Sequence, residues 1–196
     1  MPVWVTPLMV IRAVDQIGEG HTPSMHHSWV PLKDMSPEMP LAVMASEDQL
    51  FLKHHGFDFE AIQTAVKRNK AAGKKKYGAS TISQQTAKNV FLWPGRSWLR
   101  KGLEMYFTVL IEFVWGKERI MEVYLNSIEM GEGIYGVKAV AREHFDKSPE
   151  ELTRRDCALI AATLPNPLRY SSKSPSDYML KRQRKITREM KHVKWK

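Results

Sequence analysis

Residues 47–58 read Glu-Asp-Gln-Leu-Phe-Leu-Lys-His-His-Gly-Phe-Asp, and the interpretation of the whole chain starts from them. On a helix, Glu47, Phe51 and His54 are spaced i, i+4 and i+7, so they would share one face. Gly56 follows as a residue that can end such a helix. An acid, a ring and an imidazole on one face, followed at once by a turn, suggest a carboxylate at the mouth of a cleft. An ordinary amphipathic helix with solvated acids and a buried Phe51 fits the same spacing.

The composition is that of a globular domain with a large positive charge. The chain has 196 residues, 43% of them hydrophobic and 26% charged, and its formal net charge is +9. These values exclude a disordered chain and predict an anionic partner, namely nucleic acid, a membrane surface or a phosphorylated substrate. The single cysteine, Cys157, excludes an internal disulfide and lies in an apolar run, so we expect it in the core. No segment reaches the ~18 apolar residues of a membrane span.

Helical periodicity runs through most of the chain and no convincing series of strands appears, so we predict a mostly α protein. In the long helix expected to end near Trp115, the predicted core stripe is Leu103, Phe107, Leu110 and Val114. The other predicted helices span residues 41–54, 58–70, 117–130, 134–145 and 153–164.

Two stretches carry unusual polar density. Residues 67–76 hold six basic residues in ten around Gly73, which fits either a solvated loop or a loop facing anions or a membrane. Residues 78–89 read Gly-Ala-Ser-Thr-Ile-Ser-Gln-Gln-Thr-Ala-Lys-Asn. If Ser80 or Thr81 caps a helix there, its free backbone N–H groups would attract an anion. The glutamine pair and the lysine would follow on the first turns, able to donate to phosphate or sugar oxygens.

Residues 47–58 and 78–89, taken with three later stretches, resemble the peptidoglycan glycosyltransferases. Residues 47–58 match that family's ED-x-x-F-x-x-H-x-G pattern. Residues 78–89 match its G-G-S-T-I-[TS]-Q-Q-x-x-K-N pattern, with Ala79 in place of the second glycine. Arg96, Arg100, Lys101 and Glu104 then match R-x-x-x-R-K-x-x-E.

The remaining matches follow in the family's order and at close to its spacing. Residues 117–136 match the K-x-x-I-x-x-x-Y-L-N run and the G-x-x-x-Y-G after it, and residues 158–167 resemble the closing A-x-L-A-x-L-P-x-P segment. The resemblance covers residues 29–170, nearly the whole globular part. Asp146 departs from it, since a glycine is usual there, and this leaves the local turn open.

The resemblance implies a lysozyme-like helical domain, with a larger head lobe and a smaller membrane-facing jaw lobe around a cleft. It divides the chain into an N-terminal membrane-proximal segment (1–28), a glycosyltransferase domain (29–170) and a basic C-terminal tail (171–196). Residues 129–131 are similar to the monofunctional biosynthetic subgroup. The family's transmembrane helix has no counterpart in the sequence. We therefore expect a soluble or truncated form of an enzyme of the bacterial inner membrane, acting on the periplasmic face.

The family polymerises lipid II into glycan strands and releases undecaprenyl diphosphate. By resemblance, Glu47 is the base that takes the proton of the attacking sugar hydroxyl. Glu104 is the second catalytic carboxylate, near the diphosphate, with a divalent cation (Mg²⁺ or Mn²⁺) there and no organic cofactor. The substrate-binding positions carried over are Asp48, Ser80, Gln84, Gln85, Lys88, Arg96, Arg100, Lys101, Tyr124 and Asn126.

The expected partners are lipid II, the growing glycan strand, the membrane surface and other proteins of cell-wall synthesis. Anionic headgroups would attract the net positive charge. Apolar residues between the two acids are candidates for entering the bilayer, although a place in the core fits them equally well. These candidates are Tyr77, Phe91, Leu92 and Trp93.

Two alternatives belong to other functional classes. A lysozyme-like hydrolase or lytic transglycosylase would share the fold and the single acid, but it has no diphosphate to bind and no need of the polar residues 80–89. A nucleic-acid-binding domain would interleave aromatic with basic residues, and the basic loop and tail contain almost none, so we expect no nucleic acid partner. For His54 we expect a buried hydrogen-bonding role that orients the loop carrying the acid.

Overall fold

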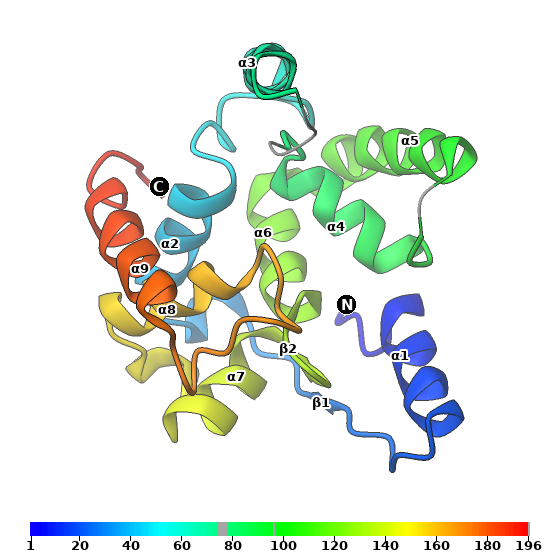
Figure 1. Ribbon diagram of the computed structural model, residues 1–196, viewed down its shortest axis with the longest axis vertical. Helices are drawn as coiled ribbons and strands as arrows, with labels where there is room; N and C mark the ends of the chain where they lie inside the picture. The colour runs from blue at the N-terminus through cyan, green and yellow to red at the C-terminus, as the bar shows by residue number, and fades with distance from the viewer. Residues whose placement is uncertain (74–77, 96, 196) are drawn as a thin grey trace.

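The computed structural model of the chain describes residues 1–73, 78–95 and 97–195. Helices dominate it, which confirms the predicted mostly α class, and a small sheet joins them (Figure 1). The helices are α1 (Pro7–Gly18), α2 (Glu38–Glu47), α3 (Phe59–Ala71), α4 (Ile82–Phe91), α5 (Trp98–Val114), α6 (Gly116–Ser127), α7 (Gly136–Phe145), α8 (Arg154–Thr163) and α9 (Asp177–Glu189). Short 3-10 helices span Leu32–Asp34 and Pro149–Glu151.

The sheet takes residues that the periodicity assigned to helices. Its order is β1-β3-β2, in which β3 (Ile134–Tyr135) runs parallel to β1 (His26–His27) and antiparallel to β2 (Glu129–Gly131). The predicted helices over 117–130 and 134–145 therefore each lose one end. Gly136 makes the tight turn from β3 into α7: its φ is +80°, and a Cβ there would lie 2.5 Å from the carbonyl oxygen of Asn126.

The main core lies between α2, α6, α7 and α8, with α9 packed on the outside of α8 (Figure 1). Residues 171–196, interpreted above as a basic tail, contain α9, whose Met179 and Ile186 are buried together with Met190 just beyond it. The C-terminal part is therefore a packed helix with a basic outer face. Cys157 is fully buried, as predicted, and burial raises the pKa of its thiol to about 12.

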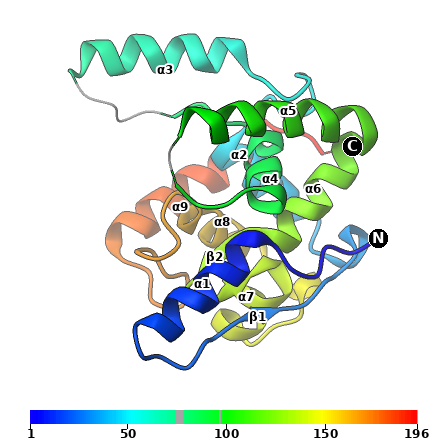
Figure 2. The ribbon, with the colours of Figure 1, turned by 90° about the vertical axis from the view of Figure 1, so that its right-hand side faces the viewer.

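A second group of helices stands beside this core. α4 packs on both α5 and α6, and α3 lies apart from the other helices in both views (Figures 1 and 2). Partly buried polar contacts join α4, α5 and α6. Ser83 Oγ of α4 and Lys117 Nζ of α6 both donate to Glu112 Oε1 of α5, each at 2.5 Å. This junction fixes α4 relative to α5, which matters because the two helices carry the cations described below.

The predicted core stripe of α5 was wrong for Leu110 and Val114, which are exposed, whereas Phe107 packs against the core. The buried residues of α5 are Glu104, Thr108 and Ile111, spaced i, i+4 and i+7. The loop after α2 covers this polar stripe: Gly56 has φ +91°, and a Cβ there would lie 2.8 Å from Thr108 Cγ2. Because α5 buries this face, the following apolar side chains of the helix are exposed: Trp98, Leu99, Met105, Tyr106, Val109, Leu110, Phe113 and Val114.

Two sequence expectations about turns and spans have clear outcomes. Asp146 ends α7 in the left-handed conformation, with φ 52° and ψ 44°, so it forms the turn for which the family usually has a glycine. Over the three described ranges, no helix has both the length and the apolar character needed to cross a bilayer.

Candidate active site

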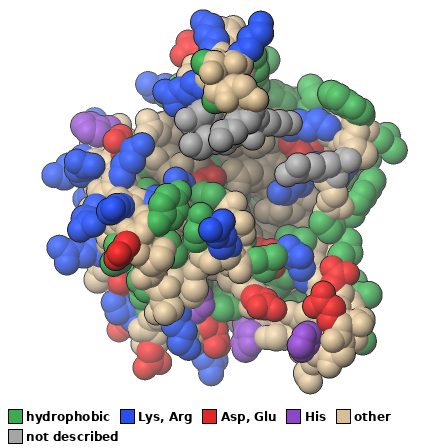
Figure 3. All heavy atoms as spheres, viewed as in Figure 1, with side chains coloured by type: hydrophobic (Ala, Val, Ile, Leu, Met, Phe, Trp, Pro, Cys, Tyr) green, Lys and Arg blue, Asp and Glu red, His purple; other side chains and the backbone are tan. Residues whose placement is uncertain are grey.

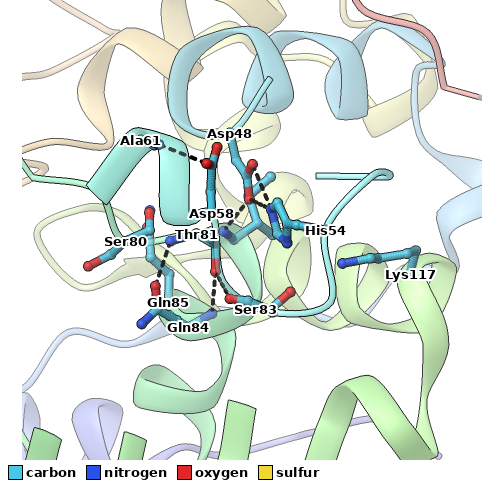
Figure 4. A network of polar contacts seen from close by, with 12 residues as sticks. Asp48, His54, Asp58, Ala61, Ser80, Thr81, Ser83, Gln84, Gln85 and Lys117 are labelled. Atoms are coloured by element: carbon cyan, nitrogen blue, oxygen red, sulfur yellow. Dashed lines mark hydrogen bonds and ion pairs between the residues drawn. The ribbon is translucent and has the colours of Figure 1, made fainter. Parts of the chain in front are cut away.

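Helix α2 ends at Glu47, well before the predicted end at His54. The chain leaves the helix at Asp48, whose carboxylate accepts the backbone N–H of Ile82 at 3.0 Å and bonds His54 Nε2 at 2.9 and 3.0 Å (Figure 4). Phe51 then turns into the core and is fully buried. The predicted common helical face of Glu47, Phe51 and His54 is therefore wrong, because these tertiary contacts override the helical spacing.

The Asp48–His54 pair joins the loop after α2 to the start of α4. Asp48 is 6% exposed and the His54 side chain 9%, so the pair is nearly dry and electrostatically strong. The predicted orienting role of His54 is confirmed by these hydrogen bonds. Both carboxylate oxygens of Asp48 make contacts within the protein, and Asp48 also lines the second cavity described below, so the substrate contact predicted for it stays a prediction.

Helix α4 begins with the capping box that the sequence allowed for. Thr81 Oγ1 accepts the N–H of Gln84 at 3.1 Å, and Gln84 Oε1 accepts the N–H of Thr81 at 3.1 Å. Gln84 is buried, and its amide oxygen serves this cap instead of a ligand. The expected anion at this helix start is supplied by the protein itself, as the carboxylate of Asp48. Ser80, just before the cap, is exposed and free of this arrangement.

Glu47 is held mainly by neutral hydrogen-bond donors. Ser46 Oγ donates to Oε1 at 2.8 Å and Gln85 Nε2 donates to Oε2 at 3.3 Å. Arg182 Nη2 lies farther away, 3.6 Å from Oε1, and donates to Ser46 Oγ at 3.0 Å. The Glu47 side chain is 14% exposed, so it is oriented by the protein yet reachable from the cleft.

Tyr124 acts on Glu47 through Gln85. Its hydroxyl donates to Gln85 Oε1 at 3.1 Å, which turns the Gln85 NH₂ group towards Glu47. Burial, followed by the charges of Glu47 and Asp48, raises the pKa of Tyr124, so its hydroxyl remains a proton donor. Tyr124 is 1% exposed, and the substrate contact predicted for it is replaced by this positioning contact.

Glu104 has the opposite environment. It is 4% exposed, Lys101 Nζ contacts its Oε1 at 2.5 Å, and Arg100 Nη1 contacts its Oε2 at 3.4 Å. Lys88 of α4 faces the same cluster from the side. The Lys88 side chain keeps exposed surface, and partial desolvation beside the protein lowers its pKa; Glu104 opposes that change, and Arg100 and Lys101 add to it. Three cations around one carboxylate leave an excess of positive charge.

Two cavities adjoin these side chains, and the molecule is visibly hollowed between α5 and the main core (Figure 3). The first, of about 360 Å³, is lined by Gln85, Lys88 and Arg100 together with residues of α1 and of 164–167. The second, of about 410 Å³, is lined by Glu47, Ser80 and residues of α3. Gln85 connects the two, because it lines the first cavity and donates to Glu47 in the second. Arg96, another predicted site residue, lies outside the described residues.

Asn126 does not reach either cavity. It is fully buried, its Oδ1 accepts the N–H of Val30 at 2.9 Å, and its Nδ2 donates to the carbonyl oxygens of Val30 and Glu122 at 2.9 and 2.8 Å. The structure therefore contradicts a substrate contact for Asn126. The Asn126 side-chain amide pairs with both the N–H and the C=O of Val30, and this holds the segment before α2 against α6.

The described residues do not build a metal site. Within ranges 1–73, 78–95 and 97–195, no three His, Cys, Asp or Glu side chains come together to hold an ion. Both oxygens of Glu104 already face Lys101 and Arg100, so a divalent cation there would compete with two positive charges. The residues do not fit the predicted Mg²⁺ or Mn²⁺, whose presence stays a prediction.

Sequence reasoning missed Ser46 and Arg182, which contact Glu47 and each other. For Arg182 a signal existed. It lies at i+3 from Met179 and i−4 from Ile186, within the buried apolar stripe of α9, whereas the other basic residues of that helix lie on its outer face. An arginine inside an apolar stripe indicates a charge held by the interior. Ser46 carried no comparable signal.

Comparisons with known proteins agree with this geometry. Residues 14–191 match the family described as Transglycosylase. The chain is 60% identical over 193 residues to the biosynthetic peptidoglycan transglycosylase of Bacteroides thetaiotaomicron, covering 98% of this chain and 77% of that protein. The proteins of the same name from Bdellovibrio bacteriovorus and Caulobacter vibrioides are 54% and 55% identical over 186 residues, covering 95% of this chain and 74% and 78% of theirs.

Proposed function

The chain belongs to the transglycosylase family, and from this premise we propose how its cleft polymerises lipid II, with Glu47 as the base and a cation cluster on the leaving diphosphate. The protein is a peptidoglycan glycosyltransferase that joins lipid II units into glycan strands. The observation that carries the assignment of roles is the contrast between the two acids. Glu47 has neutral donors and lines a cavity, whereas Glu104 is buried beneath two cations.

Glu47 takes a proton from the attacking sugar hydroxyl. As that O–H bond breaks, the oxygen forms a bond to the anomeric carbon of the donor, and the bond from this carbon to the diphosphate oxygen breaks. The electron pair leaves with the diphosphate. Hydroxyls are poor nucleophiles at neutral pH, so removal of the proton by a fixed carboxylate accounts for roughly 10²–10⁴ in rate. Ser46 and Gln85 hold that carboxylate by hydrogen bonds, and Arg182 lies 3.6 Å from its Oε1.

The leaving group is stabilised by cations held in advance. Lys88 and Arg100 line the first cavity, and Lys101 lies beside them on α5. Glu104 holds Arg100 and Lys101 in place, so it acts as a positioning residue for the cations and not as a second base. Charge that develops on the diphosphate meets dipoles and cations that need no reorganisation. Exposed Ser80 and the amide of Gln85 supply further hydrogen bonds along the same cleft.

The apolar faces of two helices support a membrane surface as partner. The outward residues of α5 include Phe113, 89% exposed, and the outer face of α1 carries Val10, Val14 and Ile17 at 50–60%. Figure 2 has both helices foremost, and Figure 3 has hydrophobic side chains along the corresponding edge. Exposed apolar surface of this extent is typical of a lipid or protein contact. We assign α3–α5 to the jaw lobe, the remaining core to the head lobe, and the site of action to the extracytoplasmic face of the inner membrane.

This face differs from the residues that the sequence singled out. Leu92 is 2% exposed and Phe91 stacks on Phe107, with ring centroids 4.6 Å apart, so both belong to the interior. Trp93 is 43% exposed, and Tyr77 lies outside the described residues. Replacing Phe113 by serine should weaken binding to anionic vesicles, while Leu52→Ser, exposed elsewhere, should not. Equal binding by the two variants would reject the α5 face as the contact.

The experiment that tests the function uses purified protein and labelled lipid II. Polymer should appear, with one undecaprenyl diphosphate released for each new linkage. A hydrolase or lytic transglycosylase would instead shorten preformed glycan and release no diphosphate. The cluster of Lys88, Arg100 and Lys101 argues against that alternative, because cleavage of glycan produces no anionic leaving group.

A further inference from the structure

The first cavity has a wall that does not belong to the cation cluster, and it carries another arginine. We propose that Arg12, on helix α1, is a further substrate-binding residue, which holds the diphosphate of the polyprenyl-linked donor from the side opposite Lys88 and Arg100. This inference rests on the proposed function and adds the N-terminal helix to its site.

Helix α1 is oriented so that one face closes the cavity. Thr6 caps it by accepting the N–H of Met9 at 3.3 Å, and Pro7 fixes its first turn. Met9 is fully buried, and α1 packs against α4. Leu8 and Arg12, one turn apart, line the cavity that Lys88 and Arg100 line from α4 and α5. The guanidinium of Arg12 therefore faces the space in which the diphosphate is held.

The present partner of Arg12 holds it loosely. Arg12 Nε lies 3.4 Å from Glu129 Oε1, and Nη2 lies 3.5 Å from Oε2. Charge-assisted hydrogen bonds between such groups are about 2.7–2.9 Å long. The Nε atom is buried and has no hydrogen-bond acceptor in satisfactory geometry. Burial also raises the pKa of Glu129, although Arg12 opposes that change.

The charges of the cavity favour an anion. Among its described lining residues, three carry positive charge (Arg12, Lys88 and Arg100) and one carries negative charge (Glu129). A planar guanidinium matches two phosphate oxygens at once, which an ammonium cannot do. A diphosphate in this cavity would therefore offer Arg12 the short paired bonds that Glu129 does not.

The outer face of α1 identifies the kind of diphosphate. Val10, Val14 and Ile17 are exposed and do not line the cavity, and helices α1 and α5 both lie foremost in Figure 2, on the side that faces the viewer. A ligand with its headgroup between Arg12 and Lys88 can extend an apolar tail towards that side. The chemistry that fits is a polyprenyl diphosphate, the leaving group of the donor.

The test measures binding of farnesyl diphosphate by titration calorimetry, which needs no turnover. Arg12→Gln should weaken binding about tenfold, because the substitution removes the charge from a hydrogen-bond donor to the diphosphate. Arg12→Lys should recover part of the loss, and inorganic diphosphate should show the same order of affinities. The matched control is Arg154→Gln: that side chain is 38% exposed, against 35% for Arg12, and sits 3.7 Å from a carboxylate outside this cavity. It should bind as the unmodified protein does.

Glu129→Gln separates a substrate contact from a purely structural one. Freed from its competitor, Arg12 should bind farnesyl diphosphate at least as tightly as before. If the Arg12–Glu129 pair only stabilises the fold, Arg12→Gln and Glu129→Gln should both lower the melting temperature and leave the affinity for farnesyl diphosphate unchanged. That result would overturn the proposal. If the unmodified protein binds the diphosphate through Arg12 but makes no polymer, the proposed function fails and the Arg12 site stands.

Discussion

The surroundings of Glu47 and of Glu104 are built from opposite kinds of side chain. Glu47 receives hydrogen bonds from a serine and a glutamine, and the cation paired with it among the described residues, Arg182, lies 3.6 Å from its Oε1. Glu104 has Lys101 at 2.5 Å and Arg100 at 3.4 Å. A carboxylate between neutral donors keeps lone pairs for a substrate proton, whereas a carboxylate clamped by cations mainly fixes those cations. The difference supports the proposal that the two acids, which two separate motifs of the family match, have different roles.

Removing the Glu47 carboxylate should have the greatest effect. Glu47→Gln keeps the size and the hydrogen-bonding reach of the side chain but cannot accept the proton, so turnover of lipid II should fall by about 10²–10⁴. The melting temperature should change little, since the side chain is at the cleft. Polymerisation assays with calorimetric melting on the same sample check this, and full turnover would reject Glu47 as the base.

Glu104→Gln should cost less activity, roughly tenfold to a hundredfold, and in a different way. Without the carboxylate, Lys101 and Arg100 lose their common partner and repel each other, so diphosphate stabilisation weakens. Chemistry by Glu47 remains intact. Farnesyl diphosphate affinity should fall in Glu104→Gln and stay normal in Glu47→Gln; the reverse pattern would exchange the two roles.

The alkaline side of the pH profile should report Lys88. Its pKa is lowered from the ordinary 10.5, so the ammonium loses its charge at a lower pH than a solvated lysine. Because the charged form binds diphosphate, kcat/KM should decline as pH rises through that lowered pKa. Lys88→Arg stays charged and should move the decline upward, while Lys53→Arg, exposed elsewhere, should not. A decline that is identical in all three proteins would remove Lys88 from the site.

A smaller change is expected at Arg182, which touches Glu47 only at long range and through Ser46. Arg182→Gln should lower kcat severalfold with little change in KM, because the base is less well oriented while the diphosphate cluster is untouched. Arg182→Lys should recover part of kcat. If kcat is unchanged and only the melting temperature falls, Arg182 merely attaches α9 to the core.

The sequence predicts this site unevenly, for physical reasons. Local signals sufficed where the determinants are local: Thr81 caps α4, and Lys101 and Arg100 reach Glu104 within one helix. Local signals failed where contacts between residues distant in the sequence determine the end of a helix or the direction of a side chain. Asp48 leaves α2 because its carboxylate binds His54 and the N–H of Ile82, which no spacing rule contains.

The same reason explains the error in α5. Apolar periodicity assigns its most hydrophobic face to the core, but that helix buries the polar face that meets Gly56 and α4. Apolar periodicity is the same whether the apolar face of a helix packs in the core or stays exposed, so the sequence pattern alone does not distinguish the two. The position of Arg182 in an apolar stripe indicated a buried charge, but the partners of Arg12 and Arg182 were likewise out of reach, since these contacts join residues that are distant in the sequence.

Chemical rescue tests the central claim, that Glu47 is the base and Glu104 is not, most directly. In Glu47→Ala the truncated side chain leaves room beside Ser46 and Gln85, where added formate can take the proton in place of the missing carboxylate. Lipid II polymerisation by Glu47→Ala should therefore rise saturably with formate and not with chloride at equal ionic strength, whereas Glu104→Ala should respond to neither. Formate-dependent activity in Glu104→Ala, with none in Glu47→Ala, would contradict the account.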